Sequence, residues 1–104
     1  MATSYIFAGV CGFSTQIEAE KGDNYIVHLK ITSDCKDIQR LSEKITEVNA
    51  LEEMSFRGGV PSVLEKGQKY CPHASCPVPV GIIKTVEVAA GLALPADVNI
   101  EITK

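Results

Sequence analysis

The chain has 104 residues, of which 45% are hydrophobic and 22% are charged, and its formal net charge is −3. These values are typical of one folded domain, residues 1–104, around a single core. The ten Lys and Arg residues are scattered, so no basic stripe for nucleic acid is predicted. No apolar run approaches the ~20 residues of a membrane span and the N-terminus lacks a basic leader, so we expect no membrane association and a soluble, cytoplasmic protein.

The first third of the chain predicts strands. A short apolar run at residues 5–9 indicates a first strand. Polar and apolar residues then alternate over 13–20 and again over 25–32, which is the pattern of half-buried strands. The residues between these two runs, 21–24, have turn chemistry, because Gly and Asn tolerate positive φ and Asp can bond its own backbone. The pattern therefore predicts a β-hairpin.

Two helices and a closing strand are predicted beyond the hairpin. Apolar residues at helical spacing indicate a helix over 34–50. An irregular connection follows over 51–75, in which 62–66 could form one helical turn. A second helix is predicted from 76 or 77 to about 91, because Pro77 and Pro79 suit a first turn and Gly91 suits a stop. Alternation over 98–103 predicts a final strand.

These elements predict an α+β fold. We expect a two-layer sandwich in which two main helices cover one face of a largely antiparallel sheet of three to four strands. A final strand with an uncovered edge is a template for association, so a homodimer is considered.

The chain has four cysteines, which are Cys11, Cys35, Cys71 and Cys76. In a reducing compartment such residues are thiols, metal ligands or redox groups more often than a disulfide framework. Antiparallel pairing of the hairpin about a turn at Gly22 and Asp23, with residue numbers that sum to about 45, places Phe13 opposite Thr32 and Cys11 near Asp34. Cys11 and Cys35 are therefore expected at one end of the sheet.

The position of Cys71 and Cys76 depends on the direction of the second helix. The connection over 51–75 is long enough to return along a first helix of ~25 Å, at 1.5 Å per residue. If it returns, the two helices run parallel and all four cysteines meet. If the second helix runs antiparallel to the first, Cys76 lies at the far end of the sheet. The sequence leaves both open, and we favour the parallel arrangement.

In the favoured arrangement Cys35 and Cys76 lie at helix N-termini, where free N–H groups and the helix dipole stabilise a thiolate. Four thiolates can bind zinc tetrahedrally or hold an iron–sulfur cluster, and His73 is a substitute ligand. The spacing of Cys71 and Cys76 is C-x4-C, which is less specific than paired CxxC motifs. The alternative that the thiols are small buried hydrophobes stays open.

The segment Cys76 to Val88, CPVPVGIIKTVEV, resembles the CPxP helix start of the TusA/SirA family of sulfur-carrier proteins. The resemblance rests on Cys76, Pro77, Pro79 and the apolar helix with Lys84, and it covers under a third of the chain. It implies that Cys76 is a nucleophile that carries a persulfide sulfur. Residues 31–35, ITSDC, bear a fainter similarity to accessory domains of iron–sulfur cluster assembly, where a strand leads into a cysteine that opens a helix.

Three functional hypotheses follow. The first is a small cytosolic protein that binds zinc or an iron–sulfur cluster through Cys11, Cys35, Cys71 and Cys76, with a sulfur or iron–sulfur handling protein as partner. The second is a sulfur carrier or thiol redox protein in which Cys76 is the nucleophile and Cys71 a resolving thiol. The third is a structural or interaction module with inert thiols. Whether the protein catalyses a reaction is left open.

Overall fold

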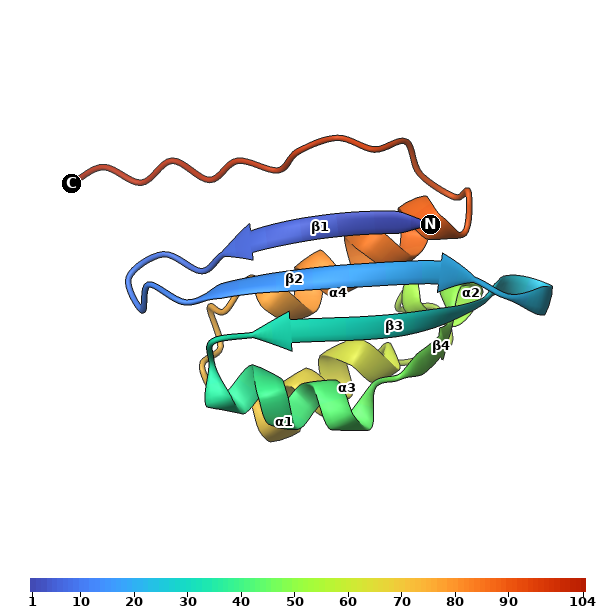
Figure 1. Cartoon of the computed structure of the whole chain (residues 1–104), viewed down its shortest axis with the longest axis horizontal. Coiled ribbons are helices and arrows are strands. Elements are labelled where there is room, and N and C mark those ends of the chain that lie inside the picture. Colours follow the sequence, from blue (N-terminus) through green and yellow to red (C-terminus); the bar gives the residue numbers. More distant parts are fainter.

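The computed structural model describes residues 1–104 and contains one antiparallel sheet of four strands in the order β1-β2-β3-β4 (Figure 1). The strands are β1 (Ala2–Phe7), β2 (Ser14–Lys21), β3 (Ile26–Ser33) and β4 (Glu47–Asn49). The period-2 patterns predicted for the hairpin are confirmed, because alternate residues of β2 and β3 are buried on one face. The observed fold is α+β, as predicted.

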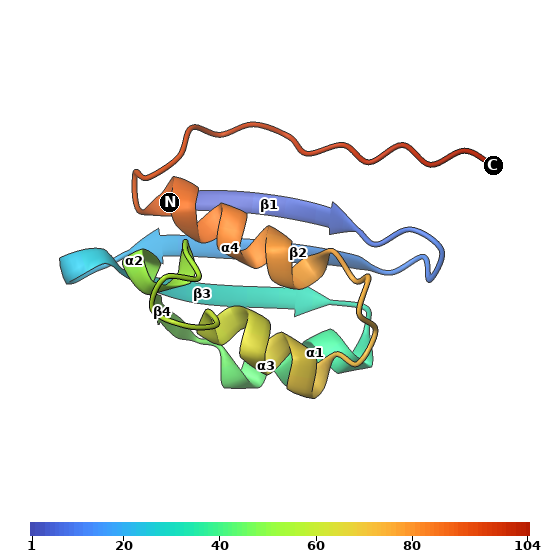
Figure 2. The same ribbon diagram turned by 180° about the vertical axis from the view of Figure 1, so that it is seen from behind.

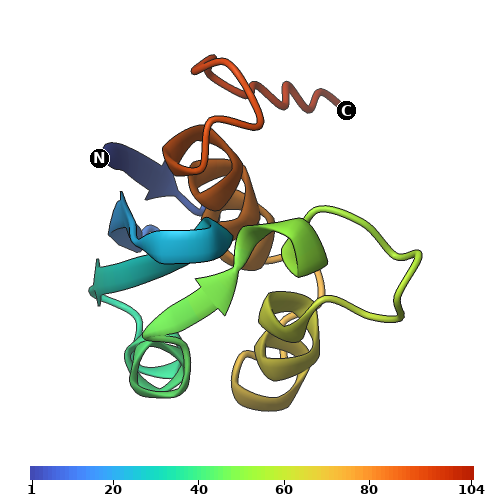
Figure 3. The same cartoon turned by 90° about the vertical axis from the view of Figure 1, so that its right-hand side faces the viewer.

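Helices cover only one face of the sheet (Figure 2). Helix α1 (Lys36–Lys44) packs against β3, and α4 (Val78–Ala89) packs against β1 and β2. Between them in sequence lie the short α2 (Ala50–Glu53) and α3 (Ser62–Tyr70), and α3 contacts both α1 and α4. The end-on view in Figure 3 shows α3 farther from the sheet than its two neighbours.

The core lies between the sheet and these helices. Its fully buried side chains come from the inner face of the hairpin and from the apolar faces of α1, α3 and α4; the largest are Ile17, Val27, Ile38, Leu41, Ile45, Val63, Val78, Ile82 and Val86. Helix α4 approaches β1 closely, since a Cβ at Gly81 would collide with the Ile6 side chain. A hydrogen bond of 2.6 Å between the hydroxyls of Ser4 and Thr85 joins the same two elements.

Helices α1 and α4 start at the same end of the sheet and run in the same direction, while α3 runs back between them (Figures 1 and 2). The chain therefore makes the return that the sequence analysis left open. This direction places the N-terminal ends of α1 and α4 beside each other, near the loop that joins β1 to β2.

The predicted hairpin register was wrong by three residues. The observed pairs, such as Ile17 with Ile31 and Ala19 with Leu29, have residue numbers that sum to 48. Directly paired residues share a face, so an odd sum would have set buried residues opposite exposed ones. The turn is also longer than a two-residue turn, because a 3-10 turn at Asp23–Tyr25 holds Asn24 and Tyr25 at φ of 53° and 65°.

The predicted first helix was too long. Helix α1 ends at Lys44. Val48 has helical spacing with Leu41 and Ile45, but it lies in β4 and pairs with Val27 of β3. A β-branched residue suits a strand as well as a helical face, so its spacing alone did not discriminate.

The connection over 51–75 was also more regular than predicted, because α3 continues to Tyr70 rather than ending after one turn. Its N-terminus is capped from a distance by Glu53, which is 3% exposed. One Glu53 carboxylate oxygen accepts from Val63 N at 2.8 Å, and the other accepts from Ser62 N and Oγ at 3.2 and 2.6 Å. Free N–H groups at the helix start are thus satisfied by a buried charge.

The predicted closing strand over 98–103 is absent. These residues are extended, but the last backbone hydrogen bond along the chain is that of Leu92 N to Glu87 O, at 2.8 Å. The segment 93–104 runs past the β1 side of the molecule in Figure 1, and the end-on view in Figure 3 shows it beyond α4, so it does not join the sheet. The alternation of polar and apolar residues correctly indicated an extended backbone. A strand forms only where that backbone also meets the edge of another strand.

We predict that Glu53→Ala lowers the free energy of unfolding by about 2–3 kcal/mol, because a charged acceptor for three donors is lost. Chemical denaturation followed by circular dichroism measures the change. Glu52→Ala is the matched control, since Glu52 is exposed on the same helix, and it should change stability by less than about 0.5 kcal/mol. Equal effects of the two substitutions would contradict the capping role.

Candidate functional site

The four cysteines and His73 line one cavity of about 140 Å³ at the end of the sheet where α1 and α4 begin. Apolar side chains complete much of the wall, among them Ala8, Phe13, Ile38 and Val78. The lining also includes Thr15 and Asp37, but no lysine or arginine. The cavity therefore gathers thiols in largely apolar surroundings.

Each thiol comes from a different structural position. Cys35 is the N-cap residue of α1, and its N–H donates to Ser33 Oγ at 3.1 Å. Cys71 is the C-cap of α3, where its N–H donates to Gly67 O at 2.8 Å. Cys76 precedes Pro77, the N-cap of α4. Cys11 lies in the loop between β1 and β2, so the site brings together segments that are distant in sequence.

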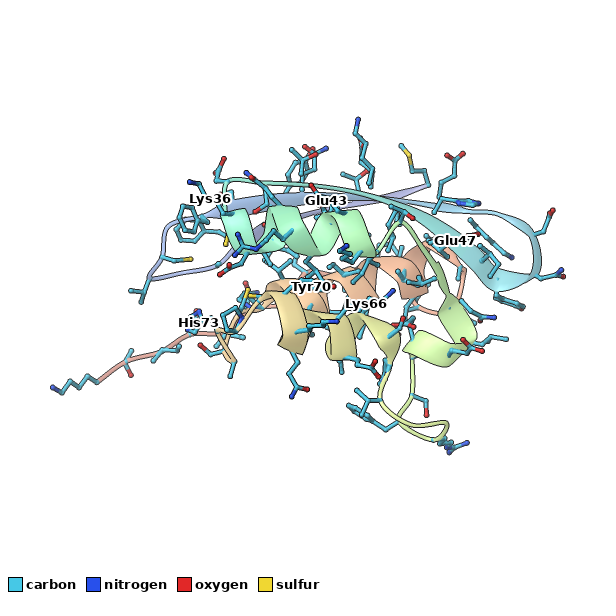
Figure 4. All side chains as sticks on the ribbon, turned by 90° about the horizontal axis from the view of Figure 1, so that it is seen from below. Lys36, Glu43, Glu47, Lys66, Tyr70 and His73 are labelled. Atoms are coloured by element: carbon cyan, nitrogen blue, oxygen red, sulfur yellow. The ribbon has the colours of Figure 1, made fainter.

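The short segment between Cys71 and Cys76 forms a turn. The N–H of Cys76 donates to His73 O at 3.1 Å, and the Ser75 hydroxyl is hydrogen-bonded to His73 Nε2 at 2.9 Å. Figure 4 shows His73 at the same end of the molecule as Lys36, the first residue of α1, and far from Glu47. The C-x4-C spacing therefore corresponds to one compact turn from the end of α3 to the start of α4.

Burial differs among the four thiols. Cys71 is 6% exposed and belongs to the core cluster, whereas Cys35 and Cys76 are half-buried and pack against it. Cys11 is exposed, in a loop where Gly9 and Gly12 have φ of 97° and 76°. These two glycines turn the chain, so Cys11 lies in a loop and not in a continuation of β2.

Burial and the proximity of the thiols set the electrostatics of the site. The pKa of Cys71 is raised from 9.0 to about 11, chiefly by burial and then by the neighbouring Cys76 and, more weakly, Cys35, while a hydrogen bond with the backbone of His73 acts in the opposite direction. Desolvation and a like charge both disfavour a thiolate. A second thiolate is therefore costly unless a positive charge enters the cavity.

All four cysteines are free, with no disulfide among them. No three of the protein's His, Cys, Asp and Glu side chains form a ready-made metal-binding group. The thiols share a cavity without adopting coordination geometry, so ligation of one ion would require their side chains to close on it.

The sequence analysis favoured convergence of the four cysteines over a second arrangement that it left open, and it missed several of their neighbours. Asp37 lines the cavity from the first turn of α1 and forms an ion pair with Arg40. Its position two residues after Cys35 was the available signal. Phe13 was assigned only to the inner side of a strand, and its contribution to the cavity depends on the loop geometry.

A family model matches residues 2–102. The chain belongs to DUF6951, a family of unknown function. The match includes all four cysteines and most of the extended C-terminal segment. No curated protein and no solved structure matches the chain.

No helix combines the length and the apolar character that crossing a bilayer demands.

We predict that alkaline pH destabilises the protein partly through Cys71. A thiol whose pKa is higher in the folded state contributes stability that is present below about 9 and is lost as the pH rises to about 11, because the unfolded chain releases the proton first. Denaturation with a chelator present, at several pH values across this window, measures the effect. Cys71→Ala should flatten the decline relative to wild type, whereas Cys11→Ala should leave it unchanged.

Proposed function

We propose that this protein binds zinc or an iron–sulfur cluster through Cys11, Cys35, Cys71 and Cys76. The observation that carries the proposal is the convergence of all four cysteines, from three separate segments, on one cavity. Thiolate ligands of one centre must converge in this way. Zinc and iron–sulfur irons both accept four sulfur ligands.

The charge distribution supports a cationic occupant. The cavity lining offers no lysine or arginine to a thiolate, and burial, together with the neighbouring thiols, raises the pKa of Cys71. A metal ion supplies the missing positive charge and holds coordinating thiols deprotonated. The residual negative charge of a four-thiolate centre would lie against the N-terminal ends of α1 and α4, where free N–H groups favour anions.

The positions of the ligands suggest how the centre forms. Cys35, Cys71 and Cys76 lie on the packed body of the protein, while Cys11 lies on an exposed loop with two positive-φ glycines. The loop can bring Cys11 onto an ion already held by the other three. His73 lines the same cavity and could replace Cys11 as the fourth ligand.

A four-thiol centre requires a reducing compartment, so we place the protein in the cytoplasm. The exposed side of the cavity at Cys11 would face a protein that handles sulfur or iron–sulfur clusters. A homodimer is the other association that we propose, and it concerns a different surface.

We predict that anaerobically purified protein contains either about one zinc per chain or iron with acid-labile sulfide. Metal analysis, sulfide assay and the visible spectrum distinguish these two. Serine substitution of Cys35, Cys71 or Cys76 should weaken zinc or cobalt binding by more than about tenfold, since even second-shell changes cost that much. Metal binding of His73→Ala, compared with that of His28→Ala as a control at an exposed histidine, tests whether a histidine is a ligand. Protein with neither metal nor sulfide, and no thiolate-to-cobalt absorption on titration, would exclude the proposal.

Sulfur transfer is the second candidate, and the position of Cys76 favours it. This thiol is half-buried directly before α4, and Cys71 lies beside it as a potential resolving thiol. A thiolate at a helix start can attack the outer sulfur of a donor persulfide, so that a new S–S bond forms at Cys76 while the donor's S–S bond breaks and the donor leaves as a thiolate. The pathway requires no metal, so the two candidates make different demands on the protein.

We predict for this second candidate that chelator-treated protein gains the mass of one sulfur atom after incubation with a low-molecular-weight persulfide. Tryptic mass spectrometry should locate the added sulfur on Cys76, and Cys76→Ser should abolish it while Cys11→Ser does not. Equal labelling of Cys11 and Cys76 would show only general thiol reactivity and would reject a dedicated carrier site.

A further inference from the structure

The outer edge of strand β1 and the C-terminal segment both lack a partner for backbone hydrogen bonding. Strand β1 pairs only with β2, so its other edge is free. The segment 93–104 is extended and makes no backbone hydrogen bond. One element therefore lacks a partner strand, and the other lacks a sheet.

The free edge of β1 has none of the features that keep monomeric proteins from edge-to-edge pairing. Its sequence, ATSYIF, contains no charged residue and no proline, and its six residues pair with β2 in continuous register. Natural edges are normally protected by lysine, proline, bulges or a covering loop. An unprotected edge of this kind can template pairing with a strand of another chain.

Apolar side chains accumulate on both elements. On the outer face of β1, Tyr5 is 78% and Phe7 is 67% exposed. In the C-terminal segment Val98, Ile100 and Ile102 alternate with polar residues, and the two isoleucines are 75% and 86% exposed. Such alternation is the pattern of a strand that buries one side against a sheet.

The C-terminal segment does not pair with β1 of its own chain. It runs along the side of the molecule where β1 forms the edge (Figures 1 and 2), yet no hydrogen bond joins the two. Holding a chain in one extended conformation costs conformational entropy, and residues without hydrogen-bonded partners do not offset this cost. The family match extends to residue 102 and therefore includes most of this segment.

We propose that the C-terminal segment of one copy adds to the β1 edge of a second copy, and that the reciprocal contact closes a two-fold dimer. One chain supplies both the edge and the strand, which makes the contact self-complementary. Main-chain hydrogen bonds to β1 give affinity, and the side chains of Val98, Ile100 and Ile102 give the register. The exchange covers the β1 edge of both copies.

The first test is the mass of the full-length protein in solution. Light scattering with size-exclusion chromatography should give twice the chain mass of 11.2 kDa at micromolar concentration. The double variant Ile100→Asp, Ile102→Asp should be monomeric. The matched control Asn99→Asp, Thr103→Asp adds the same charge to the polar side of the same segment and should stay dimeric. These residues lie outside the core, so circular dichroism should be unchanged in both variants.

The second test identifies the strand that occupies the edge. In a dimer mixed from isotope-labelled and unlabelled chains, isotope-filtered NMR should show contacts between Ile100 methyl groups and the Tyr5 ring of the other chain. A monomeric wild type, a dimer that survives the double aspartate variant, or pairing of β1 with β1 would each overturn the proposal. Neither test involves a metal or a thiol, so the result is independent of the function proposed for the cavity.

Discussion

The architecture depends on burial of a single face of the antiparallel hairpin. Ile17, Val27 and Ala19 are fully buried on that face, so every helix must lie on the same side. With three longer helices and only one face to cover, the chain places α1 over β3 and α4 over β1 and β2, and α3 returns between them. This return makes α1 and α4 parallel, and the cysteine cavity forms where both begin.

The cavity illustrates how packing and chemistry constrain each other. Cys71 belongs to the core cluster, and its burial raises its pKa to about 11. Cys35 and Cys76 stand at helix starts, which favour negative charge, but the lining supplies no lysine or arginine. The thiols are thus close enough to disfavour one another as thiolates and close enough to cooperate around a cation. A persulfide, which carries a single negative charge, makes a smaller electrostatic demand on the same site.

The two edge strands of the sheet, β1 and β4, differ in how much unpaired backbone they present. Strand β4 pairs over only three residues, so that edge is short, whereas β1 presents six uncharged residues without a neighbour. The extended C-terminal segment has the apolar alternation that such an edge accepts. The family match reaches residue 102 and so includes most of this segment, for which we propose a partner in a second copy of the chain.

The sequence by itself determined the local features: the β2 and β3 patterns, the start of α4 at its prolines, and the α+β class. These follow from side-chain period and backbone chemistry, which act within a few residues. It could not determine the hairpin register, the end of α1 before Val48, or the fate of residues 98–103, because pairing depends on which edges are available. The convergence of the cysteines was predicted only as one of two arrangements. Tertiary structure decided it, since the direction of α4 depends on how the chain between α1 and α4 packs.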